Sequence, residues 1–151
     1  MTRLTSAFGD TQALRTKTFI LAEHTFRVRV PLSAEMEALQ SRITDTDPDA
    51  VTARYDKLTT AFRTGDPIDG VVVSDEDVVV DGRSSKELAR TIIMMESRIV
   101  EYVKLLIPET GSLDDITYDD IDAEWPMQVQ LELTEKIAES IQPGYKDARK
   151  N

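Results

Sequence analysis

The chain contains no cysteine and a single histidine, and these absences remove several kinds of chemistry. Without cysteine it forms no disulfide and offers no thiol nucleophile or thiolate metal ligand. One histidine cannot build a metal site that needs several. A catalytic triad needs a base held by a partner residue, whereas His24 lies beside Thr25 at the turn of a predicted hairpin. We therefore interpret His24 as an exposed turn residue.

Glycine, aromatic residues and long apolar runs are also scarce. Gly65, Gly70 and Gly82 are isolated turn residues, and neither G-x-S-x-G nor G-x-x-x-x-G-K-[ST] occurs. Aromatic residues make up 6% of the chain, which is too few for a nucleic-acid stacking platform. No apolar run approaches the roughly 18 residues of a membrane span, and residues 1–5 lack the apolar stretch of a signal peptide. We expect a cytoplasmic protein that is not an enzyme and binds no cofactor.

Negative charge is what the chain has in excess. Residues 1–44 contain six basic and four acidic residues, whereas residues 45–151 contain twelve basic and twenty-four acidic ones. Such a surface repels phosphates, so we expect binding to neither nucleic acid nor an anionic membrane. The mildly basic end of one copy could meet the acidic part of another. Simple solvation of exposed faces explains the same pattern.

The acidic residues between Asp114 and Glu124 raise the question of a cation site. The calcium-loop pattern requires glycine at its sixth position and glutamate at its twelfth. Counted from Asp120, those positions hold Trp125 and Leu131, so the pattern fails. We interpret the segment as a solvated helix face, expect no metal centre, and leave weak adventitious cation binding open.

The N-terminal third predicts a hairpin followed by a helix. Residues 1–14 lack clear periodicity, and we expect a flexible arm. Phe26, Val28 and Val30 alternate with Arg27 and Arg29, the pattern of a strand with one wet face, and we interpret residues 16–30 as a β-hairpin. Ser33 is then a candidate N-cap for a helix from 34 to about 43.

The middle of the chain predicts a helix, a second hairpin and a long central helix. Asp47-Pro48 is a helix start signal, and the helix should run to about Arg63. Two runs of three valines, 71–73 and 78–80, flank a four-residue polar turn that is typical of a hairpin. A capping box over 84–87 precedes the broadest apolar stripe of the sequence. The inward-facing residues of this stripe are Leu88, Ile92, Met95, Ile99, Val103 and Leu106.

The C-terminal part predicts two further helices. Residues 112–116 resemble a short capped acidic helix. A last helix starts at Trp125-Pro126 and ends before Gln142. Its expected inward residues are Met127, Leu131, Thr134, Ile137 and Ile141. Residues 145–151 should be a flexible tail. The predicted fold is mainly α (α+β): one domain over 15–144 with about five helices and two small β-hairpins.

Two segments resemble proteins of one family. Residues 17–39, with Lys17-Thr18-Phe19, the stretch 26–32 and the stretch 35–39, resemble the opening of tail assembly chaperones of long-tailed bacteriophages. Residues 125–151, from Trp125-Pro126 to Lys150-Asn151, are similar to the way such proteins end. The resemblance covers about the first third and the last fifth of the chain, and the middle matches only in general character.

The resemblance implies a stoichiometric binding function. Such chaperones coat the long, apolar, helical tape measure protein in the host cytoplasm and leave before the virion matures. They are thought to self-associate into curved or spiral arrays. Many are also made in a longer form by a −1 ribosomal frameshift, and the extended C-terminal part recruits tail tube protein subunits. Lys150-Asn151 is compatible with an A-rich slippery codon run.

Candidate contact residues lie in the N-terminal hairpin and before the last helix. The hairpin candidates for contact between copies are Phe19, Phe26, Arg27, Val28, Arg29 and Val30. Their apolar members could instead simply cover the central helix. Trp125 either anchors the last helix in the core or forms an exposed binding hot spot.

Two other functions remain open at this point. A small acidic regulatory adaptor, or an inhibitor whose surface mimics DNA, would bind a basic host protein with strong salt dependence. An acidic hydrolase would need clustered carboxylates around a substrate, and spacing alone cannot identify such a pair.

Overall fold

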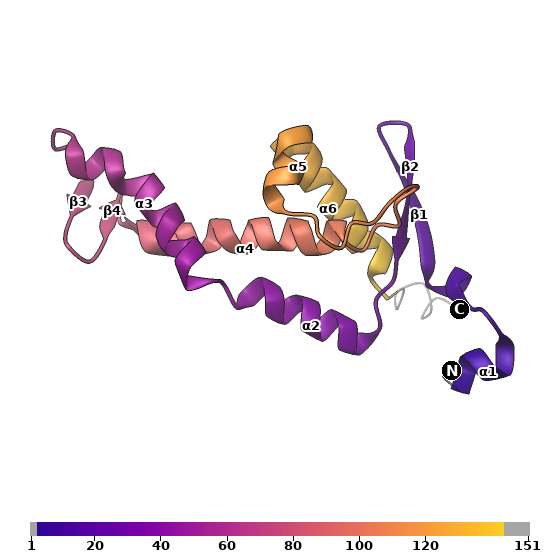
Figure 1. The fold of residues 1–151 in the computed structure, drawn as a ribbon. Helices are drawn as coiled ribbons and strands as arrows, with labels where there is room; N and C mark the ends of the chain where they lie inside the picture. The colour runs from indigo at the N-terminus through magenta and orange to yellow at the C-terminus, as the bar shows by residue number, and fades with distance from the viewer. Residues whose placement is uncertain (1–2, 144–151) are drawn as a thin grey trace, which may run out of the picture. The chain divides into compact units, whose positions relative to one another are not determined.

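The computed structural model describes residues 3–143 and has a mainly helical α+β fold, as the sequence predicts. The described part contains six α-helices, one short 3-10 helix and two small antiparallel sheets of two and three strands (Figure 1). The predicted tail, 145–151, lies outside the described residues. Contacts divide the stretch that the sequence treats as one domain into two compact units: unit 1 comprises 1–37 and 99–151, and unit 2 comprises 38–98.

Unit 1 contains the predicted N-terminal hairpin. Strand β1 (Thr16–Leu21) pairs antiparallel with β2 (His24–Arg29), with Thr16 opposite Arg29 and Leu21 opposite His24. The loop between them is only Ala22 and Glu23, at φ 49° and 67°. Two positive φ values in succession give a turn whose twist matches that of the strands, although glycine or asparagine usually occupies these positions. The sequence therefore predicts the hairpin correctly, although its loop lacks the glycine or asparagine that usually marks such a turn.

The other edge of β2 pairs with residues that the sequence assigns to a helix. Val28 forms a bridge with Leu106, Arg29 N–H donates to the Leu105 carbonyl at 2.8 Å, and Ile107 N–H donates to the Arg27 carbonyl at 2.8 Å. Helix α4 (Ser85–Val103) therefore ends before Leu106, and the predicted continuation of its stripe is wrong. Pro108 explains part of this result, because the residue before a proline disfavours helical backbone.

The core of unit 1 forms where the hairpin meets α6 (Met127–Ile141), which lies beside it in Figure 1. The buried residues of α6 are Gln130, Leu133, Thr134 and Ile137. Met127 and Leu131, predicted to face inward, are 41% and 47% exposed. Thr134 and Ile137 are buried as predicted. The prediction is wrong for the first two turns of the helix, where the buried position is held by a polar residue, Gln130.

Gln130 is 1% exposed, and its amide is fully engaged. Nε2 donates to Asp122 Oδ1 at 2.9 Å and to the Trp125 carbonyl at 2.8 Å, while Oε1 accepts from the Tyr118 hydroxyl at 2.8 Å. A buried amide is tolerated only when it is satisfied in this way. These bonds hold α5 (Tyr118–Glu124) against α6.

Helix α5 begins later than the sequence predicts. The predicted short helix over 112–116 is wrong, and the capping box lies at Thr117. Thr117 Oγ1 accepts from Asp120 N–H at 3.3 Å, and Asp120 Oδ2 accepts from Thr117 N–H at 3.0 Å. The Ser112 hydroxyl instead accepts from Asp114 N–H at 3.1 Å, two residues on, which stabilises a turn and not the first turn of a helix.

The N-terminal segment of unit 1 contains two elements that the sequence analysis missed. They are α1 (Arg3–Phe8) and the 3-10 helix η1 (Gln12–Arg15). Leu4, Phe8 and Leu14 are 67%, 74% and 80% exposed. Since neither element buries an apolar face, neither leaves a periodic pattern to read.

Unit 2 contains α3 (Pro48–Thr64), the valine hairpin and the first part of α4; helix α2 (Ser33–Thr44) crosses into it from unit 1. Asp47 caps α3 by accepting from Asp49 N–H at 3.1 Å, and Gly65 ends the helix, both as predicted. In α2 the predicted cap is wrong: Ser33 is already helical, and Glu35 accepts from Leu32 N–H at 3.0 Å instead.

The valine hairpin is confirmed and extended by one strand. Strands β3 (Val71–Val73) and β4 (Val78–Val80) pair in register, and β5 (Arg83–Ser84) adds to β4. Asp77 joins this sheet to α4, since its carboxylate accepts from the Ser84 hydroxyl and from Val78 and Lys86 N–H groups. The Ser84 hydrogen bond is the main reason why the pKa of Asp77 lies below its ordinary value.

Helix α4 buries a face slightly different from the predicted one. Leu88, predicted to face inward, is 50% exposed, whereas Ile99 and Val103 are buried as predicted. Arg54 on α3 and Glu96 on α4 form a bidentate ion pair with N–O distances of 2.6 and 3.0 Å. Such a paired fork fixes the two helices relative to each other more precisely than apolar contact alone.

We predict that Gln130→Ala lowers the free energy of unfolding by about 2–3 kcal/mol, because it removes a fully buried side chain together with its three hydrogen bonds. Urea unfolding followed by far-UV circular dichroism measures this loss. Gln128→Ala is the matched control, since Gln128 lies on the exposed side of the same helix, and should change stability by less than about 0.5 kcal/mol. Equal losses in the two variants would contradict the structural role of Gln130.

Candidate protein-binding site

An apolar groove of about 380 Å³ opens in unit 1 between the hairpin tip and α6. We call it the α6 groove. Its lining residues are Leu21, Ala22, His24, Phe26, Trp125, Val129, Glu132 and Leu133. Most of them are apolar, which is the usual character of a site that receives an apolar side chain.

The hairpin wall of the groove follows from strand alternation. Phe19, Leu21, Phe26 and Val28 share one face, because Phe19 is opposite Phe26 and Leu21 is opposite His24. The rings of Phe19 and Phe26 stack with centroids 5.3 Å apart, and His24 meets Phe26 edge-on at 4.6 Å. These contacts fix the orientation of the aromatic wall.

The opposite wall comes from Trp125 and the first turns of α6. Trp125 N–H donates to the Ile121 carbonyl at 2.9 Å, and the Trp125 carbonyl accepts from Gln130. The main chain of Trp125 is thus held firmly, while its half-buried side chain lines the groove. This placement lies between the two interpretations that the sequence offers, a core anchor and an exposed hot spot.

Ionisable side chains occupy only two positions of the lining, His24 and Glu132, and both are exposed. Gln128 Nε2 lies 3.5 Å from Glu132 Oε1, a long hydrogen bond. A largely apolar groove with a polar rim can bind an apolar partner through burial and orient it through the rim.

The remaining sequence candidates lie in different environments. Val28 is fully buried, so it stabilises the core and offers no surface. Phe19 and Val30 are half-buried, and Val30 N–H donates to the Arg15 carbonyl at 2.6 Å. Arg27 is exposed. The sequence analysis missed Leu21, Val129 and Leu133: alternation could have indicated Leu21, but nothing in the sequence places α6 against the hairpin tip.

Arg29 belongs to an ionic cluster that we call the Glu35 clamp. Glu35 Oε2 accepts from Arg29 Nη1 at 2.7 Å, and Oε1 accepts from Arg15 Nη2 at 2.7 Å. The hydrogen bond from Arg29, then that from Leu32 N–H, lowers the pKa of Glu35 from 4.5 to about 2. The clamp ties the hairpin to the first turn of α2.

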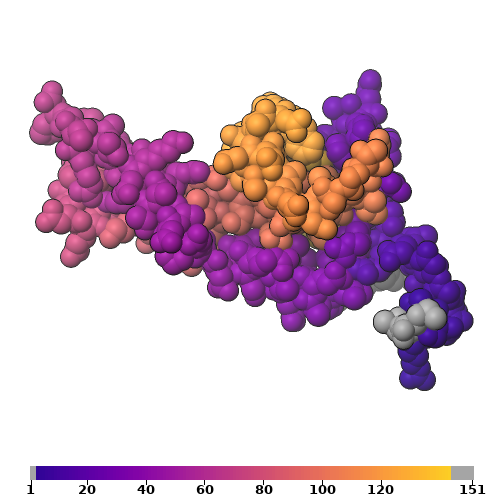
Figure 2. Space-filling view, in the orientation of Figure 1, coloured from indigo at the N-terminus to yellow at the C-terminus, as the bar shows by residue number. Residues whose placement is uncertain are grey.

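The acidic segment lies on the surface of unit 1. Residues 109–112, 114–115, 119–120 and 122–124 are exposed, and the orange part of Figure 2 shows this region. Within residues 3–143, no group of three or more His, Asp or Glu side chains is placed to hold a metal ion. Among the described helices, none is both long and apolar enough to cross a membrane.

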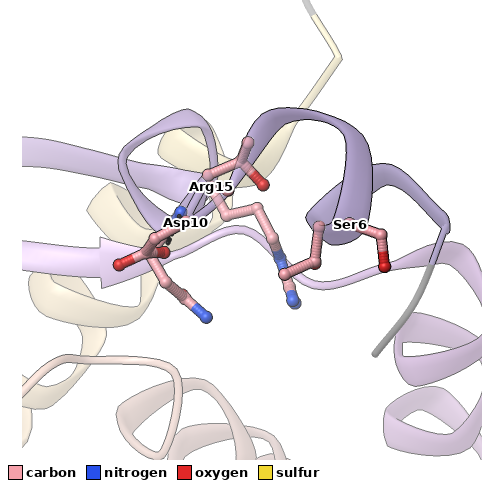
Figure 3. Close-up of a pocket in the computed structure, with 7 residues that line it drawn as sticks. Ser6, Asp10 and Arg15 are labelled. Carbon is pink, nitrogen blue, oxygen red and sulfur yellow. Dashed lines mark hydrogen bonds between the residues drawn. The ribbon is translucent and has the colours of Figure 1, made fainter.

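A second hollow of unit 1, about 470 Å³, lies among residues 5–15. Figure 3 shows Ser6 and Asp10 on opposite sides of Arg15. Asp10 accepts from Gln12 N–H at 3.0 Å, and Arg15 is already bound to Glu35 and to the Val30 carbonyl. The polar groups at this hollow therefore serve local structure.

Comparison with family models, curated proteins and solved structures finds no match for this chain.

We predict that the Glu35 clamp contributes stability only while Glu35 is ionised. Its pKa is lower in the folded chain than in the unfolded chain, so this contribution is complete above about pH 4.5 and is lost as the pH falls towards 2. Because the side chains are partly exposed, we expect about 1 kcal/mol after solvent screening. Unfolding of the unmodified chain and of Glu35→Gln at pH 6 and pH 3 measures it.

The stability difference between these two chains should shrink on acidification. Glu37→Gln removes the same charge from an exposed position in the same helical turn and is the control. A pH-independent difference for Glu35→Gln, or an identical pH profile for Glu37→Gln, would argue against the clamp.

Proposed function

We propose that this protein is a non-enzymatic assembly chaperone that binds and solubilises the tape measure protein of a long-tailed phage in the host cytoplasm. The observation that carries the proposal is the α6 groove, whose walls are apolar and whose exposed rim is polar. The resemblance of residues 17–39 and 125–151 to tail assembly chaperones supports it, because these two segments supply both walls of the groove.

The groove suits one face of an amphipathic or apolar helix. A helix presents side chains at positions i, i+3 and i+4 to such a surface. Burial of a leucine or phenylalanine side chain stabilises a complex by about 1.5–3 kcal/mol. Trp125 and Phe26 are the aromatic side chains expected to dominate this energy, since aromatic residues are enriched at binding hot spots.

The net charge of −10 suits a protein that keeps an apolar client from aggregating. A charged complex repels other copies of itself and stays dispersed. The exposed acidic segment of unit 1 lies outside the α6 groove, so its charge does not have to be desolvated when a client binds.

Self-association and recruitment of tail tube subunits complete the proposal. Of the two hairpin arginines, Arg27 is the one suited to contact another copy, because Arg29 is held in the Glu35 clamp. A single Arg27→Glu change therefore tests the electrostatics of self-association without disturbing the clamp, with sedimentation velocity as the measurement. Recruitment of tail tube subunits would reside in a frameshifted longer form.

We predict that co-expression keeps an apolar helical tape measure fragment soluble, and that Val129→Glu abolishes this effect by placing a charge in the groove. The soluble fraction of the fragment is the measurement. Ile68→Glu is the matched control, since Ile68 is 55% exposed in unit 2. If Val129→Glu folds poorly, Val129→Thr replaces it. This change keeps the side-chain shape but adds a hydroxyl, so it should cause a smaller loss of soluble fragment.

An insoluble fragment in the presence of the unmodified chain would contradict the proposal. A Val129→Glu variant that keeps the fragment as soluble as the unmodified chain does would also contradict it. If binding collapses as salt rises, the acidic adaptor becomes the better interpretation, because apolar burial depends little on screening.

We also predict that Trp125, the only tryptophan of the chain, reports client binding directly. Its half-buried side chain should lose contact with water when a helix fills the groove, so its fluorescence emission should shift to shorter wavelength. Titration with the tape measure fragment measures the shift, with Val129→Glu as the non-binding reference. An emission spectrum that stays constant at saturation would place the client elsewhere.

A further inference from the structure

Unit 2 contains a groove of its own, about 490 Å³ in volume, between α3 and the start of α4. We call it the α3–α4 groove. Its lining residues are Val51, Thr52, Tyr55, Asp56, Asp75, Glu76, Lys86, Glu87 and Arg90. The apolar members, Val51 and Tyr55, are half-buried and form a floor, whereas all six charged residues are exposed at the rim.

The rim charges form no ion pairs with one another or with the rest of the described chain. None of the six takes part in an ion pair within 4 Å in the part of the chain that the structure describes. The same two helices do pair Arg54 with Glu96. The rim therefore keeps its charges available to a partner.

The charges are also arranged asymmetrically. The α3 side and the β3–β4 turn contribute the carboxylates of Asp56, Asp75 and Glu76 with no basic residue among them. The α4 side is mixed, with Glu87 between Lys86 and Arg90. Four acidic and two basic residues leave the groove with a net charge of −2, concentrated on one side.

The floor is suited to the aliphatic part of a basic side chain. Lysine and arginine lay their methylene groups on apolar surface while the charged end stays at a polar rim. Tyr55 already binds one guanidinium group of the chain itself. The Arg63 guanidinium lies 5.8 Å from the Tyr55 ring centroid and donates to the Tyr55 hydroxyl at 2.7 Å.

We propose that the α3–α4 groove binds a peptide segment of another protein that presents arginine beside an aliphatic residue. The aliphatic groups rest on Val51 and Tyr55, and the guanidinium faces Asp75 and Glu76. The proposal does not depend on the α6 groove, which belongs to the other unit, so either can fail without the other.

The test uses blocked hexapeptides of alternating leucine and arginine, leucine and glutamate, or leucine and glutamine. Titration of the ¹⁵N-labelled chain should show the arginine peptide binding most tightly, with shifts at the amides of Val51, Tyr55 and Glu76. The double variant Asp75→Asn/Glu76→Gln should bind this peptide about fivefold more weakly.

Asp66→Asn/Asp69→Asn is the matched control, since both residues are exposed in unit 2, lie outside the groove and carry the same total charge. It should bind like the unmodified chain. Equal binding of the three peptides, shifts confined to other residues, or equal weakening in the control would each overturn the proposal. Absence of binding by the arginine peptide would overturn it as well.

Discussion

The buried amide of Gln130 is the interaction on which the arrangement of unit 1 depends. Its bonds to Asp122 and to the Trp125 carbonyl decide which face of α6 turns inward. With that face fixed, Val129 and Leu133 line the groove, while Met127 and Leu131 remain exposed. Burial of a polar group at the centre of a packing face costs free energy, because the group loses its hydration. In return it can form its hydrogen bonds in few orientations of the helix, which is how buried hydrogen-bond networks specify a structure.

Strand β2 has a comparable role in the hairpin. It pairs with β1 on one edge and with residues 105–107 on the other, so it lies between two hydrogen-bonded neighbours. The Glu35 clamp adds a tie from Arg29 to the start of α2. The aromatic wall of the α6 groove is therefore supported by hydrogen bonds from three separate parts of the sequence.

Most elements could be predicted from local sequence signals. Alternation over residues 26–30, the Asp47-Pro48 start signal and the paired valine runs correspond to elements of the structure, because each signal acts within a few residues. The failures have non-local causes. Leu106 leaves its helical stripe because its neighbours Leu105 and Ile107 form hydrogen bonds with β2, and Leu131 is exposed because Gln130 takes the buried position.

The candidate site was predictable only in part for the same reason. The sequence indicates Phe26 and Trp125 as contact residues, and both line the α6 groove. Val28 shares the pattern of Phe26 but lies in the core, since alternation gives the face of a strand and not the depth of burial along it. No local signal brings the hairpin tip and α6 together.

The loop of Ala22 and Glu23 has a consequence for the order in which the chain acquires its structure. Left-handed backbone costs a residue with a side chain about 1–2 kcal/mol, and this loop adopts it twice without glycine. An isolated two-stranded hairpin is marginal even with a favourable turn. Strands β1 and β2 therefore need α6 beneath them, yet α6 is synthesised about a hundred residues later. During translation the aromatic face of the hairpin therefore stays exposed to solvent until α6 has left the ribosome.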